Sequence, residues 1–169
     1  MTTDWTRLAK QIGSFRDDGS ESGGDSFAQQ AFDEIFGDEW IESTVEHIIS
    51  FKGGRELAMN CLRYLHSTKA AKYAYHVYKT SDGERAGQAV WLIKHLANPI
   101  AFDWVEEFLQ DENVIHWGIG VLDELLWTEQ IPYDDKAKSL LDLAERSSNG
   151  QLKEQADFIR QYLLERNWH

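Results

Sequence analysis

The histidines and the single cysteine are the side chains in this sequence that could bind a transition metal. His66 and His95 fall at neighbouring positions of two successive predicted helices and could face each other across a groove, with Cys61 as a further ligand. Zinc sites are typically recognised by four ligands at characteristic spacings, which these residues lack. We therefore expect surface or hydrogen-bonded histidines, no metal and no cofactor. Cys61 falls within an apolar helical pattern, so we predict a buried, unreactive thiol.

Paired carboxylates could act as a general acid and base. Asp123 and Glu124 point away from the predicted apolar face of Leu122 and Leu126 and, with Trp127 nearby, could form a polar site. Acid catalysis would require one of these carboxyl groups to be desolvated, with a raised pKa. The sequence contains no HExxH, CxxC, GxxxxGK[ST] or GxSxG motif. We therefore predict no catalytic residue and no enzyme activity.

A second set of carboxylates is concentrated in residues 32–47. Glu39, Glu42 and Glu46 share one face of a helix, because residues three and four apart are neighbours there. A solvated surface and a docking surface for a cationic protein both remain open for this segment. Its acidic residues are Asp33, Glu34, Asp38, Glu39, Glu42 and Glu46.

Seven tryptophans in 169 residues is a high content. Many would serve core packing, but Trp91 lies about 100° around its helix from Leu92, at the edge of the apolar face. Half-exposed Trp and Tyr side chains are frequent anchors of protein interfaces. A groove carrying Tyr64, Trp91 and Trp127 beside acidic residues would suit a basic protein.

The net charge of −12 and the isoelectric point near 4.8 disfavour binding to nucleic acid or to anionic membranes, since both would repel the chain. The charge favours a basic partner, or it serves solubility. The sequence begins with no signal-peptide pattern, and no apolar run approaches the ~20 residues of a membrane span. We therefore expect a cytoplasmic protein that binds neither nucleic acid nor membrane.

The elements that must position these residues are helices, because apolar residues recur at helical spacing and no period-2 strand is found. We predict an N-terminal segment of residues 1–26 with a short helix, Asp4–Phe15, and a flexible Gly/Ser/Asp loop. A helical domain follows over residues 27–169. It begins with a helix at Phe27–Phe36 and a second one that Asp38 caps and that runs to about Phe51.

The helices repeat at an interval of thirty residues. Leu62, Leu92 and Leu122 keep this spacing, as do Met59, Ala89 and Ile119. The preceding helices agree, in two further sets: Val45, Tyr75 and Val105, and Ile48, Tyr78 and Phe108. Each unit is a helix, a tight turn and a second helix, and a fourth unit ends with Ala156, Ile159 and Leu163. Such pairs cannot bury their apolar faces alone, so we expect them to stack side by side.

The turn-and-helix pattern resembles that of HEAT-like repeats over residues 38–127, and more loosely over 135–167. Its two clearest copies are Asp82, Arg85, Ala89, Leu92 and Leu96, and Asp111, Val114, Ile119, Leu122 and Leu126. The copy at 52–67 departs from it, with Gly53-Gly54 at the turn and His66 in place of a leucine. The resemblance implies an all-α, right-handed α-solenoid of about eight to ten helices.

In size, acidity and aromatic content the chain also resembles immunity proteins of bacterial toxin–immunity systems, some of which are built from HEAT-like pairs. That resemblance implies stoichiometric inhibition of one basic partner, a cognate toxin domain, with a nuclease favoured. A scaffold protein in a larger complex is the alternative, and a HEAT-like DNA glycosylase or bilin lyase is a third. The partner-binding residues that we predict are Asp38, Glu39, Glu42, Glu46, Tyr64, Trp91, Asp123, Glu124 and Trp127.

Overall fold

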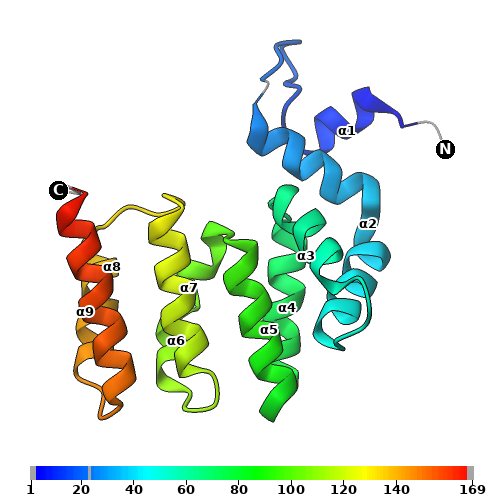
Figure 1. Ribbon diagram of the computed structural model, residues 1–169. Coiled ribbons are helices and arrows are strands. Elements are labelled where there is room, and N and C mark those ends of the chain that lie inside the picture. Colours follow the sequence, from blue (N-terminus) through cyan, green and yellow to red (C-terminus); the bar gives the residue numbers. More distant parts are fainter. Residues whose placement is uncertain (1–2, 23, 167–169) are drawn as a thin grey trace.

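The computed structural model describes residues 3–22 and 24–166, and the regular secondary structure in these ranges is helical (Figure 1). No strand forms there, only an isolated bridge between Phe15 and Glu21. The all-α prediction is therefore confirmed for the described residues. The elements are α1 (Trp5–Gln11), α2 (Asp25–Ile49), α3 (Arg55–Tyr64), α4 (Thr68–Thr80), α5 (Gly83–Leu96), the 3₁₀ helix η1 (Pro99–Asp103), α6 (Val105–Gln110), α7 (Ile115–Trp127), α8 (Asp135–Glu145) and α9 (Gly150–Glu165).

Residues 1–2 of the predicted N-terminal segment, Gly23 in its predicted loop and residues 167–169 of the predicted helical domain lie outside the described residues. Within them, α1 stops at Gln11, four residues before the predicted Phe15, because Gly13 has a positive φ of 77° that turns the chain. No helix of the described residues is long and apolar enough to cross a membrane.

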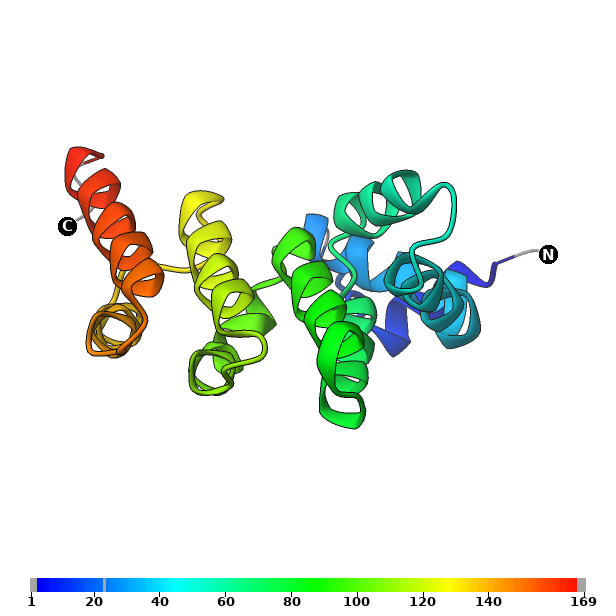
Figure 2. The same cartoon turned by 60° about the horizontal axis from the view of Figure 1, so that its bottom comes forward.

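Consecutive helices form pairs that lie side by side: α4 with α5, α6 with α7, and α8 with α9. Figure 2 shows α3, α5, α7 and α9 in one layer and α4, α6 and α8 in the other. Neighbouring members of each layer also touch, α5 with α7 and α7 with α9 in the first, and α6 with α8 in the second. The core therefore runs continuously between the two layers, and we call this part the stack.

The positions that repeat at thirty residues form that core. Leu62, Leu92 and Leu122 are completely buried, and their counterpart Ile159 in the last pair is as well. Burial of a leucine side chain stabilises a fold by about 1.5–3 kcal/mol, so these equivalent positions hold each pair against the next. His66 breaks the pattern because α3 ends at Tyr64, which leaves His66 outside the helix with a positive φ of 48°.

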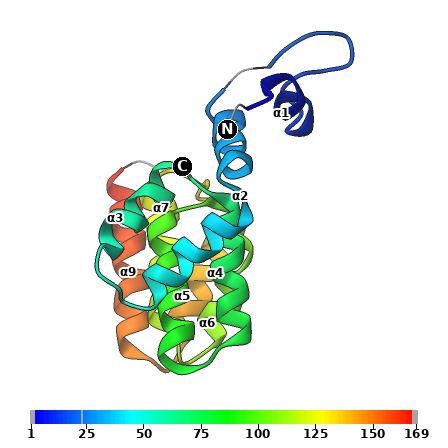
Figure 3. The same ribbon diagram turned by 90° about the vertical axis from the view of Figure 1, so that its right-hand side faces the viewer.

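Element α2 consists of two helices that meet at a kink, as the sequence predicts. The backbone leaves the helical region only at Gly37 (φ 75°, ψ 164°), so the predicted break is at the right place. The carboxylate of Asp38 pairs with Lys69 Nζ at 2.9 Å, and no capping bond from Asp38 is found among the described residues. Residues 25–36 of α2, together with α1, stand off the stack, and we call them the arm (Figure 3).

Cys61 is exposed, which corrects the prediction of a buried thiol. Helix α3 buries a single narrow stripe, formed by Met59 and Leu62. Cys61 follows Met59 by two residues, about 200° around the helix, and therefore lies on the opposite side. The apolar pattern of this short helix is thus narrower than its composition indicates.

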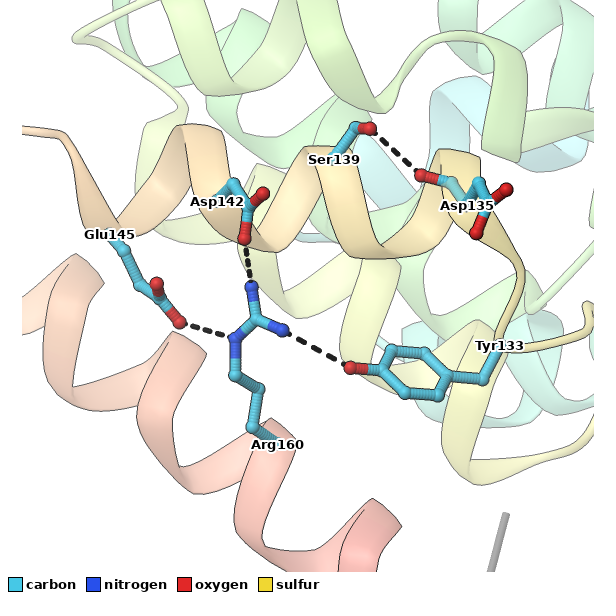
Figure 4. A network of polar contacts seen from close by, with 6 residues as sticks. All are labelled: Tyr133, Asp135, Ser139, Asp142, Glu145 and Arg160. Atoms are coloured by element: carbon cyan, nitrogen blue, oxygen red, sulfur yellow. Dashed lines mark hydrogen bonds and ion pairs between the residues drawn. The ribbon is translucent and has the colours of Figure 1, made fainter. Parts of the chain in front are cut away.

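The last pair is joined by a polar network as well as by apolar packing. Figure 4 shows Arg160 of α9 directed at Asp142 and Glu145 of α8, and at Tyr133 in the preceding loop. Its Nη1 donates to the Tyr133 hydroxyl at 3.2 Å. Charge-assisted bonds of this kind are stronger than neutral ones, so two carboxylates of α8 are committed to the fold.

Two glycines of α7 differ in what surrounds them. A Cβ added to Gly118 would lie 2.6 Å from Phe108 Cβ and 3.0 Å from the carbonyl carbon of Phe108 in α6. A Cβ added to Gly120 would meet only the flexible side chain of Lys94, at 3.1 Å. Gly118 thus permits the close approach of α6 and α7, which the small residues at 118–120 indicate.

We predict opposite effects of alanine at these two sites. Gly118→Ala should lower the free energy of unfolding by about 1–3 kcal/mol, because the clash with Phe108 involves backbone. Gly120→Ala should leave stability unchanged or raise it by up to about 1 kcal/mol, since alanine favours the helix and Lys94 can move. Urea unfolding of the two variants measures both effects. Equal destabilisation by both substitutions would contradict the packing described.

Candidate functional site

The four predicted acidic residues of α2 divide into two groups. Asp38 pairs with Lys69, and Glu46 accepts bonds from Arg85 Nη2 at 2.7 Å and from the Tyr73 hydroxyl at 3.2 Å. Glu39 and Glu42 are exposed and have no ion-pair partner within the described part of the chain. Internal ion pairs therefore neutralise half of the predicted acidic surface, and Glu39 and Glu42 remain available to a partner.

The two predicted tryptophans are each covered by an arginine of the protein itself. The Arg55 guanidinium lies 4.0 Å from the ring centroid of Trp91, and that of Arg166 lies 3.9 Å from the ring of Trp127. Such cation–π contacts contribute about 0.5–2 kcal/mol each. Both link neighbouring pairs of the stack, so these rings serve the fold, although Trp127 keeps 52% of its surface exposed.

The remaining predicted residues do not line one groove. Tyr64, 90% exposed at the end of α3, lines a cavity of about 790 Å³. Asp123 lines a separate cavity of about 620 Å³ between α7 and α9. Glu124 is half-buried beside it in α7. The predicted partner surface on α3, α5 and α7 is thus spread over distinct places.

Asp123 is the carboxyl group whose surroundings come nearest to those of a general acid. Burial raises its pKa above the ordinary value of 3.8, and the Tyr162 hydroxyl, which donates to Asp123 Oδ1 at 3.0 Å, opposes this rise. Burial also raises the pKa of Tyr162. His116 lies on the same cavity. The arrangement can hold a proton at Asp123, but its oxygen is already committed to a neighbour within the fold.

The histidines do not assemble a metal site in the described ranges. No group of three or more His, Cys, Asp or Glu residues there is placed to hold a metal ion. His95 packs edge-on against Trp91 with ring centroids 4.5 Å apart, and burial lowers its pKa. His66 lines the cavity near Tyr64.

Three aromatic side chains that the sequence reasoning did not single out form a row along α2. Phe32, Phe36 and Trp40 stack in turn, with ring centroids 6.2 and 4.5 Å apart. They remain 44, 40 and 37% exposed, and Ile35 is exposed beside them. The spacing of four residues was the available signal for Phe32 and Phe36, because it places them on one helix face. Trp40 follows the kink at Gly37, and its ring stacks on Phe36 across that kink. We call these three residues the aromatic row.

Two cavities lie between the arm and the stack. The 790 Å³ cavity is bounded by Gln29 and Phe32 of α2 and by residues at the ends of α3, α5 and α7. A smaller one, of about 340 Å³, is lined by Asp33, Thr68 and Asn98. Both include Gln29, His66 and Gln130, so they are neighbours.

We predict that Asp123→Asn changes the pH dependence of stability. Because the folded-state pKa of Asp123 lies above its unfolded value, ionisation costs stability as the pH rises from about 3.8 towards neutral. Asparagine removes that cost and can still accept the Tyr162 bond. The advantage of the variant in urea unfolding should therefore grow with pH.

Tyr162→Phe provides the companion variant. Without the hydroxyl that favours the ionised carboxylate, the pKa of Asp123 should rise further, and stability should fall over a wider pH range. Parallel pH profiles for the parent and Asp123→Asn would show that Asp123 does not titrate differently on folding.

The described residues thus offer an exposed aromatic row with two free carboxylates, and two cavities beneath the arm. No protein-family model, curated protein or solved structure matches the chain.

Proposed function

We propose that this protein is a non-enzymatic binding module for one basic protein, and that it contacts this partner through α2. The observation that carries the proposal is the aromatic row, which stays exposed on the helix that also carries the exposed Glu39 and Glu42. Contiguous exposed apolar surface rimmed by polar residues is typical of protein interaction sites. The stacked rings supply anchors, and the carboxylates supply charge complementarity to a cationic surface.

An immunity protein is the form of this function that we favour. Such a protein would bind a cognate toxin domain, a nuclease in the favoured case, and block its active site. A nuclease must present basic residues to phosphate, and the net charge of −12 would steer such a domain to the chain. The proposal includes a cytoplasmic location, where an inhibitor would meet an incoming toxin.

We propose also that the stack is a right-handed solenoid of HEAT-like pairs. The thirty-residue spacing and the burial of equivalent leucines in successive pairs support it. In this arrangement each pair contacts only its neighbours, so an element at one end can project without disturbing the core. The arm would then be the terminal element that this protein adapts for binding.

The experiment is affinity capture from the source cell's lysate at low and at high salt, followed by titration of the purified partner. We expect one basic protein with a toxic domain, bound one to one, and rescue of cells that express this domain. Glu39→Lys with Glu42→Lys should weaken binding at least tenfold at low salt. The deficit should shrink at high salt, because screening removes the electrostatic contribution.

The aromatic row is tested by Phe36→Ala and Trp40→Ala. Each should cost about 1–2 kcal/mol of binding free energy, mainly as faster dissociation, and this loss should be largely independent of salt. The matched control is Glu154→Lys with Asp157→Lys, which makes the same charge change on exposed positions of α9. Trp91→Ala measures the contribution to binding of the tryptophan that Arg55 covers, and so distinguishes it from the contribution of the aromatic row.

Three results would count against the proposal. Binding that is unaffected by every α2 variant would place the interface elsewhere. A set of several neutral subunits in the capture would favour a scaffold. An equal loss of partner binding in the α9 control would mean that the effect of the α2 substitutions comes from the net charge alone.

A further inference from the structure

Asp33 is a buried carboxylate that lacks a complete set of hydrogen bonds. The residue is 5% exposed, in the arm, four residues before Gly37. Its Oδ2 accepts the backbone N–H of Lys69 at 3.1 Å, at the first turn of α4. Its Oδ1 is buried and has no hydrogen-bond partner. A buried polar atom left in this state costs about 1–3 kcal/mol, and more when it is charged.

The side chains of Lys69 and Asn98, which lie near Asp33, already have partners. Lys69 Nζ pairs with Glu34 at 2.8 Å and with Asp38 at 2.9 Å. Asn98 Nδ2 donates to the His66 carbonyl oxygen at 2.9 Å and to Thr68 Oγ1 at 3.1 Å. Neither side chain therefore supplies the missing donor to Asp33 Oδ1.

The 340 Å³ cavity gives such a donor a place. Asp33 is the one acidic residue among its lining residues, and none of them is a lysine or an arginine. The other polar walls are amides and hydroxyls, including Gln29, Gln30 and Thr68. The volume is at the lower end of the range for small-molecule sites, which suits one side chain.

The chemistry of the cavity selects an organic cation. A metal ion would need several ligands together, and no such group exists in the described part of the chain. A guanidinium is planar, always charged and carries five N–H donors, so it can satisfy a carboxylate and neighbouring amide oxygens at once. The Gln29 and Gln30 side chains, one turn before Asp33, are the movable groups that can admit it to Oδ1.

We propose that the Asp33 cavity receives the guanidinium of an arginine side chain presented by the basic partner. The inference rests on the proposed function and gives it a specific contact. The arginine would enter between the arm and the stack, near Phe32, so that the aromatic row and the cavity would belong to one interface. The buried charge pair would supply specificity that the exposed Glu39 and Glu42 cannot.

The first test is an NMR titration of the ¹⁵N-labelled protein with the blocked tripeptide Ac-Ala-Arg-Ala-NH₂. We expect chemical-shift changes confined to the side-chain amides of Gln29, Gln30, Asn98 and Gln130. The same peptide with citrulline in place of arginine is nearly isosteric but neutral, and it should bind at least tenfold more weakly. Free arginine distinguishes a metabolite from a peptide side chain, and it should bind no better than the blocked peptide.

Asp33→Asn is the second test. Asparagine can still accept the Lys69 N–H bond, so the fold should persist while the charge is removed. Arginine-peptide binding should fall at least tenfold, and Glu154→Gln on α9 should leave it unchanged. Equal binding of the citrulline and arginine peptides would overturn the proposal even if Asp33→Asn failed to fold. Binding of free arginine but not of the blocked peptide would mean that the ligand is a metabolite and not a side chain of the partner.

The partner itself separates the two proposals. If Asp33→Asn weakens the captured partner at least tenfold, the cavity contributes to the interface. If Phe36→Ala weakens it and Asp33→Asn does not, the proposed function stands and the arginine site is wrong. If neither variant matters, both proposals fail.

Discussion

The bend at Gly37 is the constraint on which the rest of the molecule depends. Its φ of 75° with ψ of 164° belongs to a backbone region that is essentially restricted to glycine, and a Cβ there would meet no atom within 4 Å. The requirement therefore comes from the backbone and not from packing. After the bend, Ile41, Val45 and Ile48 are buried in the stack. Before it, residues 25–36 leave the stack (Figure 3), and Phe32 and Phe36 remain exposed there.

Charges and rings are used differently within the stack and along the exposed part of α2. Within the stack they join neighbouring elements: Arg85 reaches Glu46 of α2 from α5, Arg160 reaches two carboxylates of α8, and Arg55 covers Trp91. These groups are committed to the fold. On α2, Glu39 and Glu42 and the aromatic row have no comparable engagement among the described residues, and Asp33 keeps an unsatisfied oxygen. These side chains, which lack a full set of partners within the described residues, thus lie on α2 and at the cavities between the arm and the stack.

The sequence predicts the helices and the buried positions well, because burial imposes the helical spacing that Leu62, Leu92 and Leu122 record. It predicts the break near Gly37 from Asp38, a residue type that favours the start of a helix, but not the direction in which the arm leaves. The mispredicted burial of Cys61 shows that a short helix can bury a narrower stripe than its apolar content indicates. The partners of Asp38 and Glu46, and the arginines over Trp91 and Trp127, depend on contacts between distant segments. Such contacts leave no periodic signal in one sequence. The sequence could therefore predict which types of residue form the candidate site, but not which of them already have partners within the fold.

Hydrogen exchange of the full chain with and without its captured partner tests the central claim most directly. Amide protection on binding reports which elements an interface covers or rigidifies. If α2 carries the interface, protection should concentrate in residues 25–49 and in the ends of α3 and α5 that border the arm, with little change in α8 and α9. Protection confined to α7, α8 and α9, with α2 exchanging as in the free protein, would contradict the account.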